Sequence, residues 1–236
     1  MAGYLLLMLS LGMGGIALLG FTVFLLHGPL TLVDLGLNDV MLLAWNLCLS
    51  LLFFLQHSVM IRKSFRHWIP FPERYVGVVY ALSSSIPLLL LVGLWQQSHT
   101  TLLIIQGPLR WALRAIFVFA IGVMLWGVRS LGSFDTFGTE PLIAHMKGRK
   151  PKRLSFSVRG PYRWVRHPLY SVVLVLIWSS PDITLDRLWF NLTWTVWIVI
   201  GTLLEERDLL ERFGDRYREY QEKVPMLMPY KGPAVC

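Results

Sequence analysis

The chain has 236 residues, of which 55% are hydrophobic and only 15% are charged. Because a water-soluble domain carries about 25% charged residues, this composition excludes an ordinary soluble enzyme and favours a membrane protein. The net charge of +8 would suit a nucleic-acid partner, but the basic residues gather in segments that flank apolar stretches. We therefore expect this charge to orient the chain in a membrane, and we expect no nucleic-acid partner.

Four apolar segments are long enough to cross a bilayer, which takes about 20 helical residues. These segments are residues 4–26, 40–57, 75–95 and 111–131. Two shorter apolar pieces, residues 169–179 and 188–204, flank a turn that contains Pro181 and predict a helical hairpin. Residues 205–223 are too charged for hydrocarbon but carry one apolar stripe, which predicts an amphipathic helix on the membrane surface. The expected fold is all-α: a polytopic membrane helical bundle with four full spans, a C-terminal helical hairpin and an interfacial helix.

The basic residues are distributed unevenly among the expected loops. Loops 58–74 and 132–167 are rich in Lys and Arg, whereas loops 27–39 and 96–108 contain neither. The positive-inside rule then places both termini in the cytoplasm, and we expect a multi-pass protein of a bacterial inner membrane. We divide the chain into a four-span N-terminal region, residues 1–131, and a C-terminal region, residues 132–236, that carries the candidate chemistry.

The stretch from Arg159 to Tyr170 reads Arg-Gly-Pro-Tyr-Arg-Trp-Val-Arg-His-Pro-Leu-Tyr and stands at the entrance of a predicted membrane helix. Pro168 suits the first helical position, so the free N–H groups just after it, beside Arg166 and His167, predict an anion site. Glu205 and Glu206 end the returning helix at the same membrane face. Together these features suit a ligand that carries both signs of charge, although they would also serve as anchors at the membrane interface.

The order and spacing of these residues, followed by Phe213-Gly214, Tyr217, Tyr220 and Val224-Pro225, resemble the membrane methyltransferases of the isoprenylcysteine carboxyl methyltransferase superfamily. The resemblance covers roughly residues 150–230. It implies that S-adenosylmethionine is the cofactor and sits over the hairpin. The residues that it implies for cofactor binding are Leu154, Ser155, Phe156, Ser157, Tyr162, Arg166, His167, Pro168, Leu169, Tyr170 and Glu205.

The sequence Gln56-His57-Ser58-Val59-Met60 and the run around Glu205-Glu206 are similar to the methanethiol S-methyltransferases and their relative nurim. This second resemblance covers most of the chain and implies S-methylation of a small apolar thiol. The alternatives are another lipid-soluble acceptor, such as a prenylcysteine carboxylate or a phospholipid amine, or a nurim-like protein without enzymatic activity. Gly201 stands where the isoprenylcysteine enzymes have an arginine that meets the substrate, which disfavours a prenylcysteine.

A thiol acceptor has to lose its proton, since the thiolate is the nucleophile. His57, His167 and Glu206 are the candidate catalytic residues for this step, and the sequence does not rank them. None of the six histidines has the spacing of a metal-ligand pair, so we expect no metal site. Membrane lipid is a further expected partner, and the oligomeric state does not follow from the sequence.

Overall fold

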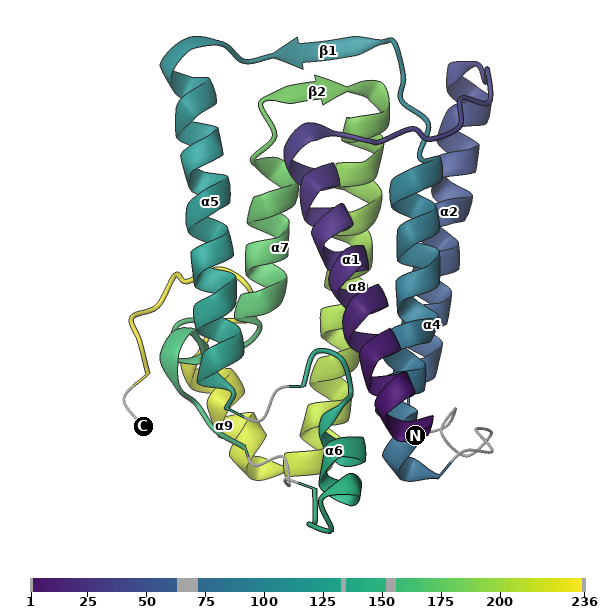
Figure 1. Ribbon diagram of the computed structural model, residues 1–236. Helices are drawn as coiled ribbons and strands as arrows, with labels where there is room; N and C mark the ends of the chain where they lie inside the picture. Colours follow the sequence, from purple (N-terminus) through teal and green to yellow (C-terminus); the bar gives the residue numbers. More distant parts are fainter. Residues whose placement is uncertain (1, 63–71, 133–134, 152–155, 235–236) are drawn as a thin grey trace. The chain divides into compact units, whose positions relative to one another are not determined.

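The computed structural model describes residues 2–62, 72–132, 135–151 and 156–234. Within these ranges the chain forms eight α-helices, one 3-10 turn and two short strands (Figure 1). In chain order they are α1 (Ala2–His27), α2 (Asp39–Ile61), α4 (Glu73–Leu94), β1 (Thr101–Ile104), α5 (Gly107–Ser130), α6 (Glu140–Met146), η1 (Gly160–Arg163), α7 (Pro168–Trp178), β2 (Asp182–Thr184), α8 (Leu185–Phe213) and α9 (Asp215–Lys223).

The apolar segments expected to span a membrane are helical. Five helices, α1, α2, α4, α5 and α8, are long and apolar enough to cross a bilayer, and α7 is a shorter apolar helix. The all-α fold class and the multi-pass membrane character are therefore confirmed.

The end of α8 differs from the sequence-based prediction. The prediction places a separate surface helix over residues 205–223, but α8 runs without a break from Leu185 to Phe213. No glycine or proline occurs between residues 202 and 213, so nothing in the local sequence ends the helix there. Gly214, with a φ of 57°, ends α8 in the left-handed conformation that glycine adopts readily, and α9 follows it.

The two short strands are a second difference, because no part of the sequence predicts them. β1 and β2 pair in a two-stranded sheet (Figure 1). Beyond this pairing, Ile105 N donates to Pro181 O at 2.9 Å, and Arg110 makes hydrogen bonds of 2.7 and 2.6 Å to the two carboxylate oxygens of Asp182. These contacts join the beginning of α5 to the end of α7.

The chain divides into two compact units that are interleaved along the sequence. The first contains α1, α2, α4, α6 and residues 184–190, and the second contains β1, α5, η1, α7, α9 and residues 191–213 of α8. The expected division into a four-span region, residues 1–131, and a region that carries the chemistry, residues 132–236, stays a prediction.

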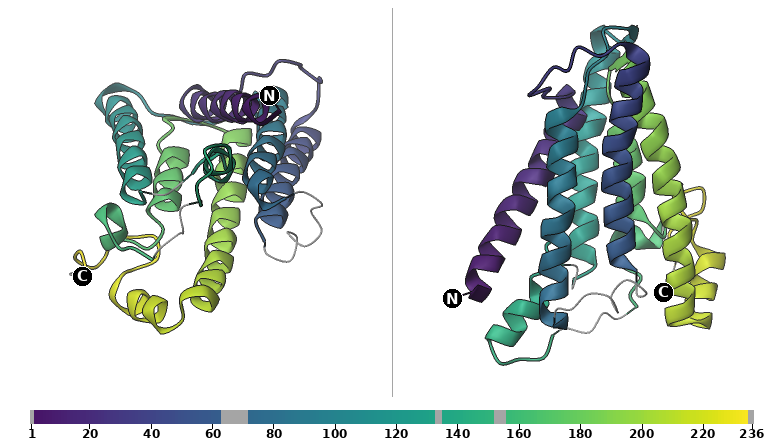
Figure 2. Two further views of the ribbon diagram at one scale, coloured as in Figure 1. Left: turned by 60° about the horizontal axis from the view of Figure 1, so that its bottom comes forward. Right: turned by 90° about the vertical axis from the view of Figure 1, so that its right-hand side faces the viewer.

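In the first unit, α4 packs between α1 and α2 (Figure 2). The rings of Phe24, Trp95 and Phe190 meet edge to face, with centroids 5.0 to 5.6 Å apart. Asp186, at the beginning of α8, accepts hydrogen bonds from Trp95 Nε1 and Ser98 N, each at 3.0 Å. These contacts attach the first turn of α8 to the C-terminal ends of α1 and α4.

In the second unit, α5 packs against both α7 and η1. Gly160 begins η1 with a φ of 55°, and a Cβ atom at this position would lie 2.2 Å from Ser130 Oγ of α5. Because real Cβ contacts are never that short, only glycine fits at this turn. The turn brings the chain close against α5 just before it reaches Arg166.

Candidate active site

The segment that leads into α7 is held in place by the chain that follows α9. The backbone N–H groups of Arg166 and His167 donate to the carbonyls of Pro225 and Met226 at 2.9 and 3.1 Å. One turn into α7, the hydroxyl of Ser171 donates to Leu227 O at 2.7 Å. Pro168 takes the first helical position, where its missing N–H costs nothing. The structure thus fixes the backbone of this segment from outside the helix.

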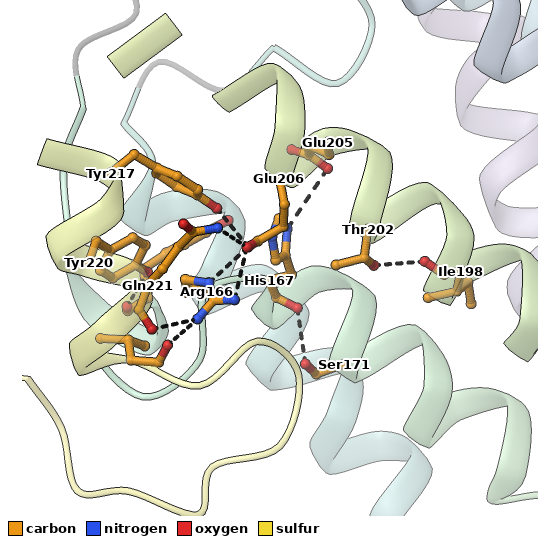
Figure 3. Close-up of polar contacts among 12 residues, drawn as sticks. Arg166, His167, Ser171, Ile198, Thr202, Glu205, Glu206, Tyr217, Tyr220 and Gln221 are labelled. Atoms are coloured by element: carbon orange, nitrogen blue, oxygen red, sulfur yellow. Dashed lines mark hydrogen bonds and ion pairs between the residues drawn. The ribbon is translucent and has the colours of Figure 1, made fainter. Parts of the chain in front are cut away.

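Glu206 lies at the centre of the region, near the end of α8. Five polar contacts converge on its carboxylate, and Figure 3 shows the side chains pointing toward it. Oε1 lies 2.8 Å from Arg166 Nε, 2.7 Å from His167 Nε2 and 2.7 Å from the Tyr217 hydroxyl. The other oxygen, Oε2, lies 2.9 Å from Arg166 Nη2 and 2.5 Å from Gln221 Nε2. The carboxylate therefore joins the beginning of α7 to α9.

The charges around Glu206 are matched. The side chains of Arg166 and Glu206 are only 10% and 9% exposed, so the two form a nearly buried ion pair. Although burial works against the charged form, hydrogen bonds with Glu206 raise the pKa of Arg166. Burial, and then the hydrogen bond to Glu206, raise the pKa of Tyr217, so its phenol keeps the proton that it donates. A buried ion pair is stable when further hydrogen bonds satisfy the carboxylate oxygens, and Tyr217, His167 and Gln221 provide such bonds to Glu206.

Glu205 has a different environment from its neighbour in sequence. Its side chain is 43% exposed, and Oε2 lies 3.9 Å from Nδ1 of His167. Burial, and then the charge of Glu205, raise the pKa of Tyr162 on η1. Successive residues of a helix point about 100° apart, which explains how Glu206 turns inward while Glu205 stays partly open. Glu205 is thus a partly exposed carboxylate beside a histidine and a protonated phenol.

Most residues predicted to bind the cofactor lie in this one compact unit. Tyr162 lies on η1, Arg166 and His167 precede α7, Pro168, Leu169 and Tyr170 form its first turn, and Glu205 lies on α8. The ring of Phe156 packs against Tyr217 and Tyr220 of α9, with centroids 6.0 and 5.5 Å apart. Ser157 follows Phe156 in the loop before η1, whereas Leu154 and Ser155 lie outside the described residues.

Sequence reasoning did not assign a site role to Tyr217, Gln221 or the segment 225–227. The sequence contains one signal of a shared role for two of them: Tyr217 and Gln221 are four residues apart and therefore lie on one face of α9. Tyr220 lies on the same helix, and its hydroxyl donates to the carbonyl of Tyr162. α9 therefore supports the site through contacts with Glu206 and with the backbone of η1.

His57, the third candidate catalytic residue, belongs to the other compact unit and lies on α2. The hydroxyl of Tyr80 on α4 is 2.9 and 3.0 Å from its two ring nitrogens, and the ring of Phe53 stacks on it at 5.1 Å. The side-chain oxygens of Gln56 and Ser84 are buried and have no hydrogen-bond partner among the residues that the structure describes. Polar groups inside a membrane-spanning helix are costly and usually functional, so this polar cluster within α2 and α4 stays a candidate for acceptor binding.

The absence of a metal site stays a prediction. Over residues 2–62, 72–132, 135–151 and 156–234, no group of three or more His, Cys, Asp or Glu side chains is arranged to hold a metal ion.

Comparisons with known proteins find a methyltransferase family, several methanethiol S-methyltransferases and, at lower identity, nurim. The phospholipid methyltransferase family matches residues 110–216. The methanethiol S-methyltransferase of Pseudomonas deceptionensis is 38% identical over 190 residues, which cover 78% of this chain and 71% of that protein. The corresponding Mycobacterium tuberculosis enzyme is 34% identical over 188 residues, covering 78% and 77% of the two chains. Rat nurim is 27% identical over 191 residues, covering 71% and 68%. No solved structure matches.

Proposed function

This chain belongs to the family of integral membrane methyltransferases that includes the methanethiol S-methyltransferases, and we propose that it transfers a methyl group from S-adenosylmethionine to a small thiol. The observation that supports this proposal most is that relatives which share about a third of its residues over most of its length carry that activity in their names. The partly exposed Glu205, beside His167 and Tyr162, supplies a candidate place for the chemistry.

The residues of the site fit the charges of S-adenosylmethionine, which carries a carboxylate, an ammonium, ribose hydroxyls and a sulfonium. Glu205 offers a partly exposed carboxylate for the ammonium or for the hydroxyls. The N-terminus of α7 has no side-chain cap and suits the carboxylate of the ligand. When bound, the cofactor supplies an activated methyl group, so the protein's tasks are to align the acceptor and to exclude water.

A small thiol is the acceptor that the observations favour. Methanethiol is the acceptor in the names of the relatives that are 34–38% identical to this chain. Gly201 on α8 provides no cation one helical turn before Glu205, so a carboxylate acceptor such as a prenylcysteine would lack a charge partner there. The apolar character of the surrounding helices suits a substrate that dissolves in lipid.

The arrangement in the membrane that we propose has four full crossings and a returning hairpin, with both termini on the cytoplasmic side. α1, α2, α4 and α5 each cross once, and α7 and α8 form the returning hairpin. The rise of 1.5 Å per residue carries α8 about 30 Å between Leu185 and Glu205, which is the thickness of the hydrocarbon. Glu205 then lies at the cytoplasmic boundary, with the charged end of α8 and all of α9 beyond it. Lys and Arg in residues 135–166 support this orientation.

The test uses protein purified in detergent. S-adenosylmethionine is titrated by calorimetry, and methyl-labelled cofactor is then offered with methanethiol, a prenylcysteine analogue or phosphatidylethanolamine. We expect binding and label transfer to methanethiol. Label transfer only to one of the other two acceptors, or no cofactor binding, would overturn the proposal.

Glu205→Ala tests the proposed cofactor site. Losing a hydrogen bond that involves a charged group costs about 1.5–3 kcal/mol, so the affinity for S-adenosylmethionine should fall about 10- to 100-fold. Glu211→Ala is the matched control, because Glu211 is an exposed carboxylate of the same helix. If both variants bind the cofactor as the parent does, Glu205 does not contact it.

A further inference from the structure

The contact between Glu206 and His167 defines which ring nitrogen of the histidine carries the proton. All contacts on the Glu206 carboxylate other than that of His167 come from donors, two of them from the charged guanidinium of Arg166. An ionised carboxylate can only accept hydrogen bonds, so His167 Nε2, at 2.7 Å from Oε1, has to be a donor. The neutral imidazole therefore carries its proton on Nε2 and its lone pair on Nδ1.

The second ring nitrogen, Nδ1, lies on the side of the ring toward Glu205. Nδ1 lies 3.9 Å from Oε2 of Glu205, which is beyond hydrogen-bond distance, and within the described part of the chain no side chain or backbone group donates to it. The neighbouring Glu205 is the carboxylate that is 43% exposed. Nδ1 is thus a proton acceptor on the side of the ring that faces Glu205, the residue proposed to contact the ligand (Figure 3).

The other two candidate bases are less suited to accept a proton. The carboxylate of Glu206 already receives hydrogen bonds at both oxygens and is paired with Arg166. The ring nitrogens of His57 both lie within 3.0 Å of the Tyr80 hydroxyl. Of the three residues, His167 alone combines a fixed tautomer with a nitrogen lone pair that has no donor within the described residues.

We infer that His167 is the general base that takes the proton of the thiol acceptor, and that Glu206 is a positioning residue that fixes its tautomer. This inference rests on the proposed function. The S–H proton passes to Nδ1, and the thiolate sulfur forms a bond to the methyl carbon. The bond between that carbon and the sulfonium breaks, and its electron pair stays on the departing sulfur. The proton on Nδ1 is later released to water.

The structure also stabilises the charged state of the base that this step creates. An imidazolium at position 167 would lie between two carboxylates, 2.7 Å from Glu206 and 3.9 Å from Glu205. Its ring is 5% exposed and stacks on the ring of Tyr170, with centroids 5.7 Å apart. The backbone N–H of His167 is bonded to Met226 O. The base is therefore held in one orientation, as proton transfer requires.

The experiment compares acceptors whose thiols differ in acidity, at saturating S-adenosylmethionine. An alkanethiol reaches the enzyme protonated near neutral pH, whereas an acidic arenethiol arrives largely as the thiolate and needs no base. In His167→Gln, we expect kcat/KM to fall about 100-fold or more with the alkanethiol and less than about 10-fold with the arenethiol. A defect in folding or in cofactor binding would reduce both by the same factor, so the ratio between the acceptors isolates the base.

A second readout does not depend on activity. Nitrogen-15 NMR of histidine-labelled protein distinguishes the two neutral tautomers, and the signals of His167 are those that disappear in His167→Gln. We expect the Nε2-protonated form in the parent protein and a mixture of tautomers in Glu206→Ala, which leaves Nε2 without its acceptor. Equal losses with both thiols, or an Nδ1-protonated ring in the parent, would overturn the assignment of the base while methyl transfer itself stands. If the parent methylates neither thiol, the proposed function fails instead.

Discussion

Glu206→Gln is the change for which the structure gives the clearest energetic expectation. Glutamine keeps one oxygen, which can face the three donors at the Oε1 position, but its NH₂ group then meets Arg166 Nη2 and Gln221 Nε2, both of which are donors. Arg166 is left nearly buried without its countercharge. Breaking a buried ion pair by removing one partner costs about 3–5 kcal/mol. For a chain of this size about 1 kcal/mol corresponds to about 2–4 °C, so we expect the melting temperature to fall by about 6–20 °C.

The assay is thermal unfolding in detergent, followed by intrinsic fluorescence and circular dichroism. Glu205→Gln is the matched control, because it makes the same chemical change one residue earlier, at a side chain that is 43% exposed. Its melting temperature should stay within about 4 °C of the parent, since exposed charges contribute about 0–1 kcal/mol. Equal shifts in the two variants would refute the view that Glu206 supports the structure while Glu205 serves the ligand.

Two further predictions concern tyrosines. The pKa of Tyr217 is raised in the folded protein, so the stability due to its protonated form is complete below the ordinary value of 10.0 and is lost as the pH rises above it. The melting temperature should therefore decline above about pH 10, and less steeply in Tyr217→Phe. An unchanged slope would contradict this. Tyr80→Phe removes the hydroxyl that contacts His57 and should raise KM for the thiol several-fold with unchanged cofactor affinity. The control is Tyr4→Phe, at an exposed tyrosine of α1, and equal KM values in the two variants would exclude an acceptor role for the cluster.

The transmembrane helices could be predicted from the sequence because lipid imposes a strong local constraint. Each crossing needs about 20 apolar residues, and α1, α2, α4 and α5 follow the segments chosen on that criterion. The end of α8 could not be placed in this way. Charge shows where a helix leaves hydrocarbon, but it does not end the helix, and Gly214 is the residue that does. The strands β1 and β2, of four and three residues, are too short for any periodic pattern.

Part of the candidate site could be predicted from the sequence, because some of its residues lie in local motifs. Arg166, His167 and Glu205 stand in motifs whose order and spacing can be compared with a family. The contacts of Tyr217, Gln221 and the segment 225–227 depend instead on how α9 and the following chain fold back onto α7. Such contacts arise from tertiary packing and leave little local pattern beyond the four-residue spacing on α9.

The adjacent carboxylates show how one short motif supplies two different functions. In the sequence Glu205 and Glu206 are equivalent, and either could be chosen as a ligand or as a base. On a helix they point about 100° apart, and the docking of α9 covers only one of the two directions. Glu206 is thereby saturated with donors and orients His167, whereas Glu205 keeps a carboxylate for a charged ligand. Both roles depend on the position of the pair, because moving Glu206 by one residue would leave Arg166 without its partner and His167 without its orientation, and moving Glu205 would take the exposed carboxylate away from Nδ1 of His167.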